Sequence, residues 1–360
     1  MVLAVALGAP ASATAAASPR FFGVSYDRAA ANASAPLQTE QFRTMHEAGV
    51  GAVRTVFSWA HAQPERGGPV DFERTDALVA DATAADVELL PIVMYAPPWA
   101  RARPSRFASP PRDAGAYAHY LSQLMGRYGS GGSFWAEHPE LPARPVRAWQ
   151  IWNEPHLPWQ WDLAGRGRWQ RGYTALLKRA HRTIKRRDRG ARVVLAGLTN
   201  VSWRELARLY KAGARGSFDV AAVHVYTASV DNVFRVVKLF RTVMRRHHDA
   251  RTPLWMTEVS WPAARGKVDP GPGFRSVVTT DEGMASRLAG LYRRALRAQR
   301  SQHLQRVYWY SWGTSYVGSE DSFDYAGLGS YRDDIFIAKP ALQAFSRLAR
   351  GGTASAAALH

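Results

Sequence analysis

The sequence predicts an α/β fold, a (β/α)₈ TIM barrel formed by a single domain. Apolar, β-branched runs alternate with segments of helical period along almost the whole chain. The chain has 360 residues, 46% of them apolar, which is enough for one large barrel. No short-period repeat and no interdomain linker interrupts the alternation. A barrel therefore fits better than a doubly wound sheet with a second domain.

Four β-type runs form the first half of the predicted barrel. The first, residues 21–26, precedes a helical pattern at 36–49 that has proline near its start and glycine at its end, the usual positions of these residues in helices. The next three runs occupy residues 52–59, 88–95 and 147–155. The helical patterns that follow them occupy residues 72–86, 114–129 and 171–190, respectively.

Four further runs complete the predicted barrel. They occupy residues 192–198, 219–226, 253–261 and 307–313, and each is followed by a helical pattern. The pattern at 233–248 follows the sixth run, and the pattern at 339–350 follows the eighth.

The chain ends fall outside the predicted barrel domain, residues 19–351. Residues 1–18 have a short apolar core followed by small residues of A-x-A type, which is typical of an export signal. The basic residues that usually precede such a core are missing, and the alternative is a flexible alanine-rich leader. We therefore expect a signal peptide or disordered leader at 1–18, a disordered tail at 352–360, and a secreted or cell-wall-associated protein.

Composition excludes several classes of protein. The chain contains no cysteine, so it has no disulfide, no thiolate zinc site and no thiol nucleophile. No run approaches the roughly 18 uncharged apolar residues of a membrane-spanning helix, so we expect no integral membrane segment.

The formal net charge of +18 has two interpretations. Its basic residues are spread over predicted helices such as 171–190 and 233–248, which is typical of solvated helix faces. The alternative is attraction to an anionic partner, such as an acidic glycan or a cell-wall polymer. No nucleic-acid-binding motif is present, so we do not expect nucleic acid as a partner.

Polar and aromatic residues gather where the predicted strands end. In a (β/α)₈ barrel the active site lies at these carboxyl ends, so the residues there are expected to meet. Along the chain they are Arg54, Trp99, Asn153, Glu154, His224, Tyr226, Glu258, Trp309 and Trp312.

Two of these residues, Glu154 and Glu258, suit glycosidic bond cleavage. One carboxylic acid protonates the leaving oxygen while the other carboxylate attacks the anomeric carbon. A short separation of the carboxyl groups predicts retention of configuration, and a longer one that admits water predicts inversion. Trp159 and Trp161 follow Glu154, and aromatic rings of this kind pack against the apolar faces of sugars.

The chain resembles retaining glycoside hydrolases of clan GH-A, in particular the cellulase-like and family 39 xylosidase-like branches. The matching segments are YAPPWA, WNEPHLPWQW, HVY, MTEVSW and the run at 324–342, and together they span about residues 21 to 350 in the expected order. Two positions depart from the pattern: His156 stands where asparagine is common, and Ser260 where glycine is common.

The resemblance implies a role for each matching residue. Glu154 would be the acid/base and Glu258 the nucleophile, while Asn153 would bind the sugar 2-hydroxyl. Tyr226 and Arg54 would donate to Glu258. Contacts with the sugar would come from His224 and from Trp99, Trp159, Trp161, Trp309 and Trp312, of which Trp309 or Trp312 would shape the floor of the subsite.

These observations predict a retaining glycoside hydrolase that cleaves a β-linked glycan or oligosaccharide by double displacement, without a cofactor. No metal is expected, because His224 lacks the companions of a metal site. Two alternatives remain open. The same site could transfer the glycosyl group to another sugar, or the chain could be a non-catalytic glycan-binding or cell-wall-binding barrel.

Overall fold

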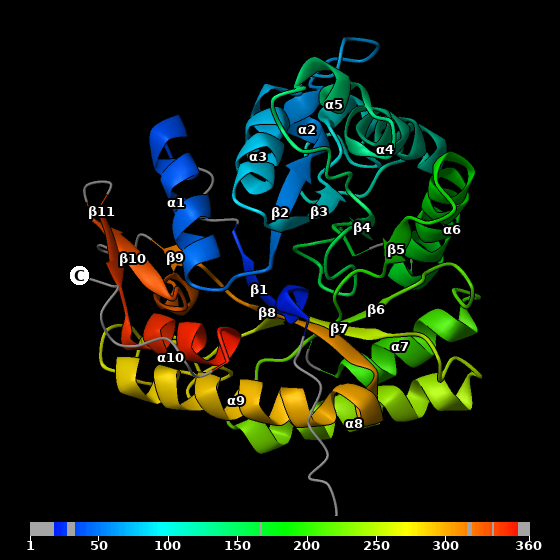
Figure 1. Ribbon diagram of the computed structural model, residues 1–360. Helices are drawn as coiled ribbons and strands as arrows, with labels where there is room; N and C mark the ends of the chain where they lie inside the picture. The colour runs from blue at the N-terminus through cyan, green and yellow to red at the C-terminus, as the bar shows by residue number, and fades with distance from the viewer. Residues whose placement is uncertain are drawn as a thin grey trace, which may run out of the picture.

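Eight parallel strands form the barrel that the sequence predicts (Figure 1). The computed structural model describes residues 18–26, 33–165, 168–199, 201–314, 319–332 and 335–351, so most of the predicted leader and the predicted tail lie outside the described residues. Each strand pairs with its sequence neighbours except β5 and β6, and β8 pairs with β1. Isolated bridges, Val194 to Val220 and Leu198 to Val223, join the fifth and sixth strands. The barrel strands are β1 (Phe22–Ser25), β2 (Ala52–Ser58), β3 (Glu88–Met94), β4 (Ala148–Ile151), β5 (Arg192–Val194), β6 (Ala221–His224), β7 (Leu254–Val259) and β8 (Leu304–Trp309).

Helices cover the outside of the barrel (Figure 1). Several begin at a side-chain cap, in which Ser34, Asp113, Ser229 or Thr280 accepts a backbone N–H of the first turn. No helix in the described ranges combines the length and apolarity that a bilayer crossing requires. The α-helices are α1 (Ala35–Glu47), α2 (Trp59–Ala62), α3 (Glu73–Ala84), α4 (Ala114–Tyr128), α5 (Ser133–Glu137), α6 (Trp169–Arg187), α7 (Ser202–Lys211), α8 (Val230–Arg246), α9 (Asp281–Gln302) and α10 (Pro340–Ala349).

Apolar side chains fill the barrel near the beginnings of its strands. Alanines at the starts of β2, β4 and β6 pack there with the larger rings of Trp255 and Tyr308. The Tyr308 ring fits because Gly23 has no side chain, and a Cβ at that position would lie 2.5 Å from Cδ1 of Tyr308. The amino-terminal end of the barrel is therefore filled, which leaves its carboxyl end for a site.

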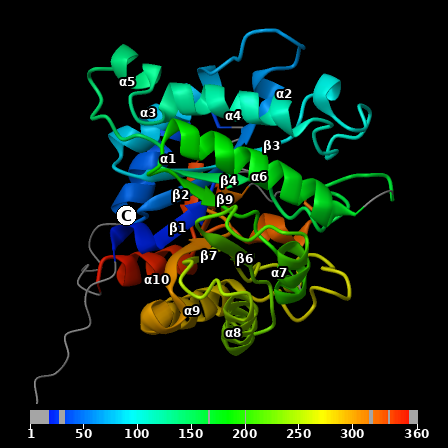
Figure 2. The same cartoon turned by 90° about the vertical axis from the view of Figure 1, so that its right-hand side faces the viewer.

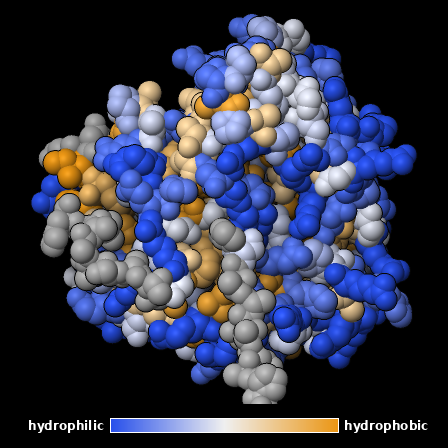
Figure 3. Space-filling view, in the orientation of Figure 1, coloured by the Kyte–Doolittle hydropathy of each residue, from blue (hydrophilic) through white to orange (hydrophobic). Residues whose placement is uncertain are grey.

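A small sheet that the sequence analysis did not predict lies between β8 and α10. It consists of β9 (Gly313–Thr314), β10 (Gly329–Arg332) and β11 (Ile335–Ala338). These strands are too short to show a clear alternation of apolar and polar residues. Figure 3 shows apolar side chains gathered over this sheet, where Ile335 and Ile337 are 66% and 42% exposed.

Candidate functional site: two glutamates at the barrel mouth

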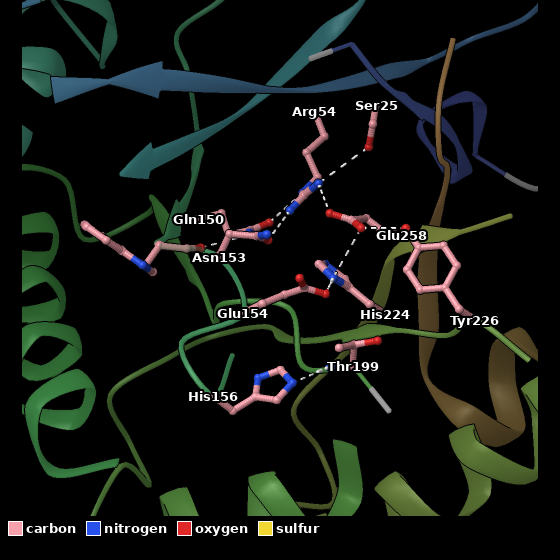
Figure 4. Close-up of polar contacts among 11 residues, drawn as sticks. Ser25, Arg54, Gln150, Asn153, Glu154, His156, Thr199, His224, Tyr226 and Glu258 are labelled. Carbon is pink, nitrogen blue, oxygen red and sulfur yellow. Dashed lines mark hydrogen bonds and ion pairs between the residues drawn. The ribbon is translucent and has the colours of Figure 1, made fainter. Parts of the chain in front are cut away.

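Glu154 and Glu258 face each other at the carboxyl ends of β4 and β7 (Figure 4). Both are largely buried, with exposed fractions of 8% and 7%. A carboxylate oxygen of one lies within 4.8 Å of a carboxylate oxygen of the other. Glu154 has a φ of 39°, in the left-handed region that costs a non-glycine residue of order 1–3 kcal/mol. The chain thus turns sharply after β4 in a way that aims the Glu154 side chain at the mouth.

Arg54 connects the strands that build the site. Its side chain, fully buried on β2, donates to Oε1 of Glu258 at 2.8 Å, to Oδ1 of Asn153 at 2.7 Å and to Oε1 of Gln150 at 2.8 Å. A planar guanidinium with several donors can satisfy three acceptors at once. Arg54 therefore fixes the positions of Glu258 and Asn153 relative to each other.

In the described structure, the hydrogen bonds of the Asn153 side chain involve its oxygen atom and not its nitrogen atom. Its Oδ1 accepts from Arg54 at 2.7 Å and from Nε2 of Gln150 at 3.4 Å. Among the described residues, no acceptor is within hydrogen-bond distance of its Nδ2. Because this amide group is a donor, it suits a sugar hydroxyl as its acceptor.

The surroundings of Glu258 favour its ionised form. Burial acts to raise the pKa of this carboxyl, but the positive charges of His224 and Arg54 and hydrogen bonds from Tyr226 and Arg54 outweigh burial, so the pKa is lowered. The Tyr226 hydroxyl donates to Oε2 at 2.6 Å. Glu258 is thus an ionised, oriented carboxylate.

The surroundings of Glu154 favour its protonated form. Burial raises the pKa of this carboxyl and the negative charge of Glu258 adds to that effect, while His224 and Arg54 oppose it. The net shift is upward. The two glutamates therefore have pKa values displaced in opposite directions, the property that separates an acid from a nucleophile.

His224 lies between the two glutamates. Its Nδ1 is 2.7 Å from Oε1 of Glu154 and 3.4 Å from Oε2 of Glu258. Its Nε2 has no hydrogen-bond partner in the described structure and points at Gly197, where a Cβ would lie only 1.8 Å away. The bare backbone of Gly197 after β5 therefore makes room for the imidazole.

A cation would have three possible ligands here, one atom each from Glu154, His224 and Glu258. The guanidinium of Arg54 already occupies Oε1 of Glu258 at 2.8 Å. Its fixed positive charge opposes a metal ion at the same carboxylate. The donor set therefore suits proton transfer better than metal binding.

The predicted aromatic contacts divide into exposed and buried rings. Trp159 is 67% exposed in the loop after β4. Trp99 is half-buried, packs edge-on against Trp59 and donates from Nε1 to the Gln63 carbonyl oxygen at 3.1 Å.

Trp161, Trp309 and Trp312 correct the expectation that each contacts the sugar, because all three indoles are buried. Trp161 packs on Trp152, Trp309 donates to the Ala326 carbonyl oxygen, and Trp312 stacks on Phe336 of β11. An indole is mostly apolar, so loops that fold back over a barrel bury it readily. Each of these rings thus packs against protein and leaves no face open to a ligand.

The two positions that depart from the family pattern are also packed inward. His156 accepts the Thr199 backbone N–H at Nε2, over 3.4 Å. Burial, together with the charge of His224, lowers the pKa of His156 to about 4, so its ring is neutral near pH 7. Ser260 is fully buried beside Trp261.

Four residues of the site were missing from the sequence prediction. Gln150 points into the barrel from β4 and accepts a hydrogen bond from Arg54. Residues two apart in a strand point to the same face, so the position of Gln150 two residues before Trp152 could have revealed its orientation. Gly197 gave no signal, because its role depends on a residue of another strand. Tyr310 and Phe323 pack against the Tyr226 ring, with centroids at 6.4 Å and 5.0 Å, and a single sequence gives no indication of that contact.

Comparisons with known proteins agree with this architecture. No family model and no curated protein matches the chain. Many solved structures do. A family 39 glycoside hydrolase from Bacteroides cellulosilyticus WH2 has 19% identity and a TM-score of 0.67, over 92% of this chain and 63% of its own.

Two further structures have similar scores. A monomeric β-xylosidase from Caulobacter crescentus CB15 has 17% identity and a TM-score of 0.66, over 93% of this chain and 69% of its own. A family 1 β-glucosidase from Thermotoga maritima has 11% identity and a TM-score of 0.64, over 93% of this chain and 99% of its own. At these identities the likeness establishes the fold, which confirms at that level the resemblance drawn from the sequence.

Proposed function

We propose that this protein is a retaining glycoside hydrolase that acts on a β-linked glycan or oligosaccharide. The observation that carries the proposal is the pair of close, buried glutamates whose pKa values are displaced in opposite directions. Carboxyl groups about 5–5.5 Å apart are typical of retention, whereas inversion needs about 6.5–9.5 Å. An oxygen separation within 4.8 Å supports retention.

In the first step a Glu258 carboxylate oxygen attacks the anomeric carbon and the bond from that carbon to the leaving oxygen breaks. Protonated Glu154 gives its proton to the leaving oxygen. Asn153 donates to the sugar 2-hydroxyl, and Arg54 and Tyr226 keep the Glu258 carboxylate oriented. The product is a glycosyl ester of Glu258 and a free alcohol.

In the second step Glu154, now ionised, takes a proton from water. The water oxygen attacks the anomeric carbon and the ester bond to Glu258 breaks, which restores both glutamates. A sugar hydroxyl in place of water would give transglycosylation through the same intermediate.

Intact-mass spectrometry after incubation with a panel of activated 2-fluoro glycosides tests the proposal. We expect the native chain to gain one glycosyl unit, and peptide mapping to place it on Glu258. The sugar that reacts identifies the unit held next to the nucleophile. The absence of an adduct with every sugar would favour inversion or a barrel that binds without cleaving, whereas an adduct on another residue would overturn the assignment of Glu258 as the nucleophile.

Two variants serve as matched controls. Glu258→Gln should abolish the adduct, because an amide is a poor nucleophile. Glu154→Gln should still form it, because an activated leaving group departs without protonation. An adduct that persists in Glu258→Gln would overturn the assignment of the nucleophile.

We also propose that the protein is exported and associates with an anionic polymer. The leader pattern supports export. The charge distribution supports an anionic partner. Helices α6 to α9 carry 20 lysines and arginines and four acidic residues, whereas α1 to α5 carry three lysines and arginines and six acidic residues. Figure 1 shows α6 and α7 on the side of the barrel opposite α1, and Figure 2 shows this side facing the viewer.

A further inference from the structure

A cavity of about 450 Å³ opens at the carboxyl end of β2. We call it the β2 pocket. It has no role in the two-step reaction described above. Its walls come from β2, α2, the start of α3 and the loop between β3 and α4, and include Val56, Ser58, His61, Arg74, Tyr95 and Phe107.

The β2 pocket lies close to the reacting centre. Val56 is two residues beyond Arg54 on β2, so both side chains point to the same side, about 7 Å apart along the strand. Arg54 contacts Glu258 and Asn153 directly. A substrate that extends from Arg54 along the end of β2 therefore reaches the wall of this pocket at Val56.

The pocket presents an aromatic ring. Phe107 is 53% exposed, one of few large apolar side chains that the described structure leaves open to solvent. The Tyr95 ring lies 4.6 Å from it, tilted by 37°, and the Arg101 guanidinium is 5.4 Å from its centroid. An aromatic face held in this way suits the apolar face of a sugar ring.

Hydrogen bonds fix the loop that carries Phe107. Arg101 donates to the carbonyl oxygens of Ala96 at 2.7 Å and Pro104 at 3.1 Å. The Asp162 backbone N–H donates to the Ala108 carbonyl oxygen at 3.0 Å, which ties this loop to the one after β4. The ring is thus positioned before a ligand arrives, which lowers the entropic cost of binding.

Polar groups surround the aromatic ring. The Ser58 hydroxyl, the His61 imidazole, the Asp71 carboxylate and the Arg74 guanidinium all line the pocket. Donors and acceptors are mixed, and both signs of charge are present. This combination suits a neutral ligand with several hydroxyl groups better than a single anion or an apolar molecule.

We propose that the β2 pocket is a second sugar subsite, in which one further unit of the glycan stacks on Phe107. The proposal rests on the proposed function and extends it: the substrate is a chain of at least two sugar units, and Phe107 determines its preferred length. Sequence analysis missed Phe107 because it lies in a loop with no periodic pattern, after the YAPPWA segment.

The test compares nitrophenyl glycosides of one and two β-linked units of the sugar that labels Glu258. We expect native kcat/KM to be higher for the two-unit substrate. Phe107→Ala should lower that value by about 3- to 10-fold, the range for one lost aromatic contact, and leave the one-unit value within about 2-fold. Phe107→Trp should restore the preference. Ile335→Ala, which removes another exposed apolar side chain, on β11, should change neither value.

Binding measurements separate the failure of this proposal from failure of the proposed function. Calorimetry of Glu154→Gln with β-linked gluco-, xylo- and manno-oligosaccharides of one to four units should show affinity that rises from one to two units, and Phe107→Ala should remove that rise. If affinity rises from one to two units but the native chain hydrolyses no substrate, the subsite proposal stands and the proposed hydrolase activity is overturned. Equal effects of Phe107→Ala on both substrate lengths, no effect on either, or no oligosaccharide binding would overturn the subsite.

Discussion

Arg54 shows how one side chain can set both the geometry and the charge of the site. Arg54→Gln removes the guanidinium contacts with Glu258 and Asn153. We expect kcat/KM to fall on the order of 10²-fold or more, as when a preorganised donor is lost. The charge of Arg54 also lowers the pKa of Glu258. Its removal should raise that pKa and move the acidic limb of the pH profile of kcat/KM to higher pH.

Arg54→Lys is the matched control for charge. A lysine keeps the positive charge but has no planar fork, so activity should still fall. The acidic limb should move less than in Arg54→Gln. Identical acidic limbs in the native chain and Arg54→Gln would show that Arg54 does not control the ionisation of Glu258.

His224 should affect both limbs of the same profile, the acidic limb through Glu258 and the basic limb through Glu154. Its charge and hydrogen bond lower the pKa of Glu154. In His224→Gln that effect is lost, so the pKa of Glu154 should rise and the carboxyl should stay protonated to higher pH. Since the first step needs protonated Glu154, we expect the basic limb of kcat/KM to move to higher pH. A shift to lower pH would contradict this role.

At the scale of elements, the segment after β5 meets β6 through Gly197 and His224. A Cβ on Gly197 would overlap Nε2 of His224, at 1.8 Å. We expect Gly197→Ala to displace the imidazole, to reduce kcat strongly and to lower the free energy of unfolding by about 1–3 kcal/mol, as overpacking does. Steady-state kinetics and urea unfolding would measure both effects.

The double variant isolates the contact between these two residues. His224→Ala leaves room for a methyl group at residue 197, so adding Gly197→Ala to it should cost little further stability. Fully additive losses would show that Gly197→Ala acts through its own backbone and not through His224.

The elements that the sequence predicted are those with a long, regular pattern. The eight strands and the helices between them were predictable because β-type apolar runs alternate with segments of helical period. The two glutamates were predictable because side chains at the carboxyl ends of barrel strands reach the mouth. The sequence did not predict features that depend on tertiary packing, such as which aromatic rings are buried. Trp312 follows β8 much as Trp159 follows β4, yet Trp312 is buried because β11 supplies Phe336 as a stacking partner. The β2 pocket likewise needs a loop whose path no periodic pattern records.

At the scale of the molecule, the basic residues of the helices are concentrated on α6 to α9. Lys178, Arg182 and Arg186 follow one stripe of α6 at intervals of four residues, about 6 Å apart. None of the three has an acidic partner within 4.0 Å among the described residues. Charges that repeat along a line suit a polymer that also carries repeated charges.

Replacement of these three residues by glutamine should weaken retention on immobilised polygalacturonate, a carboxylate-bearing polysaccharide. The native chain should bind at low salt and elute as salt increases, because exposed charges are screened. The highly methyl-esterified form of the polymer should not retain it, since its carboxylates are blocked. Turnover of a small neutral glycoside should not change, because α6 lies outside the barrel mouth.

A second triple variant distinguishes a localised surface from net charge alone. Arg43→Gln, Arg112→Gln and Arg275→Gln remove the same charge from exposed positions outside α6 to α9. If α6 to α9 bind the polymer as a surface, this variant should elute close to the native chain while the α6 variant elutes earlier. Equal losses in the two variants would mean that only total charge matters, and the charge of α6 would then be ordinary solvated surface.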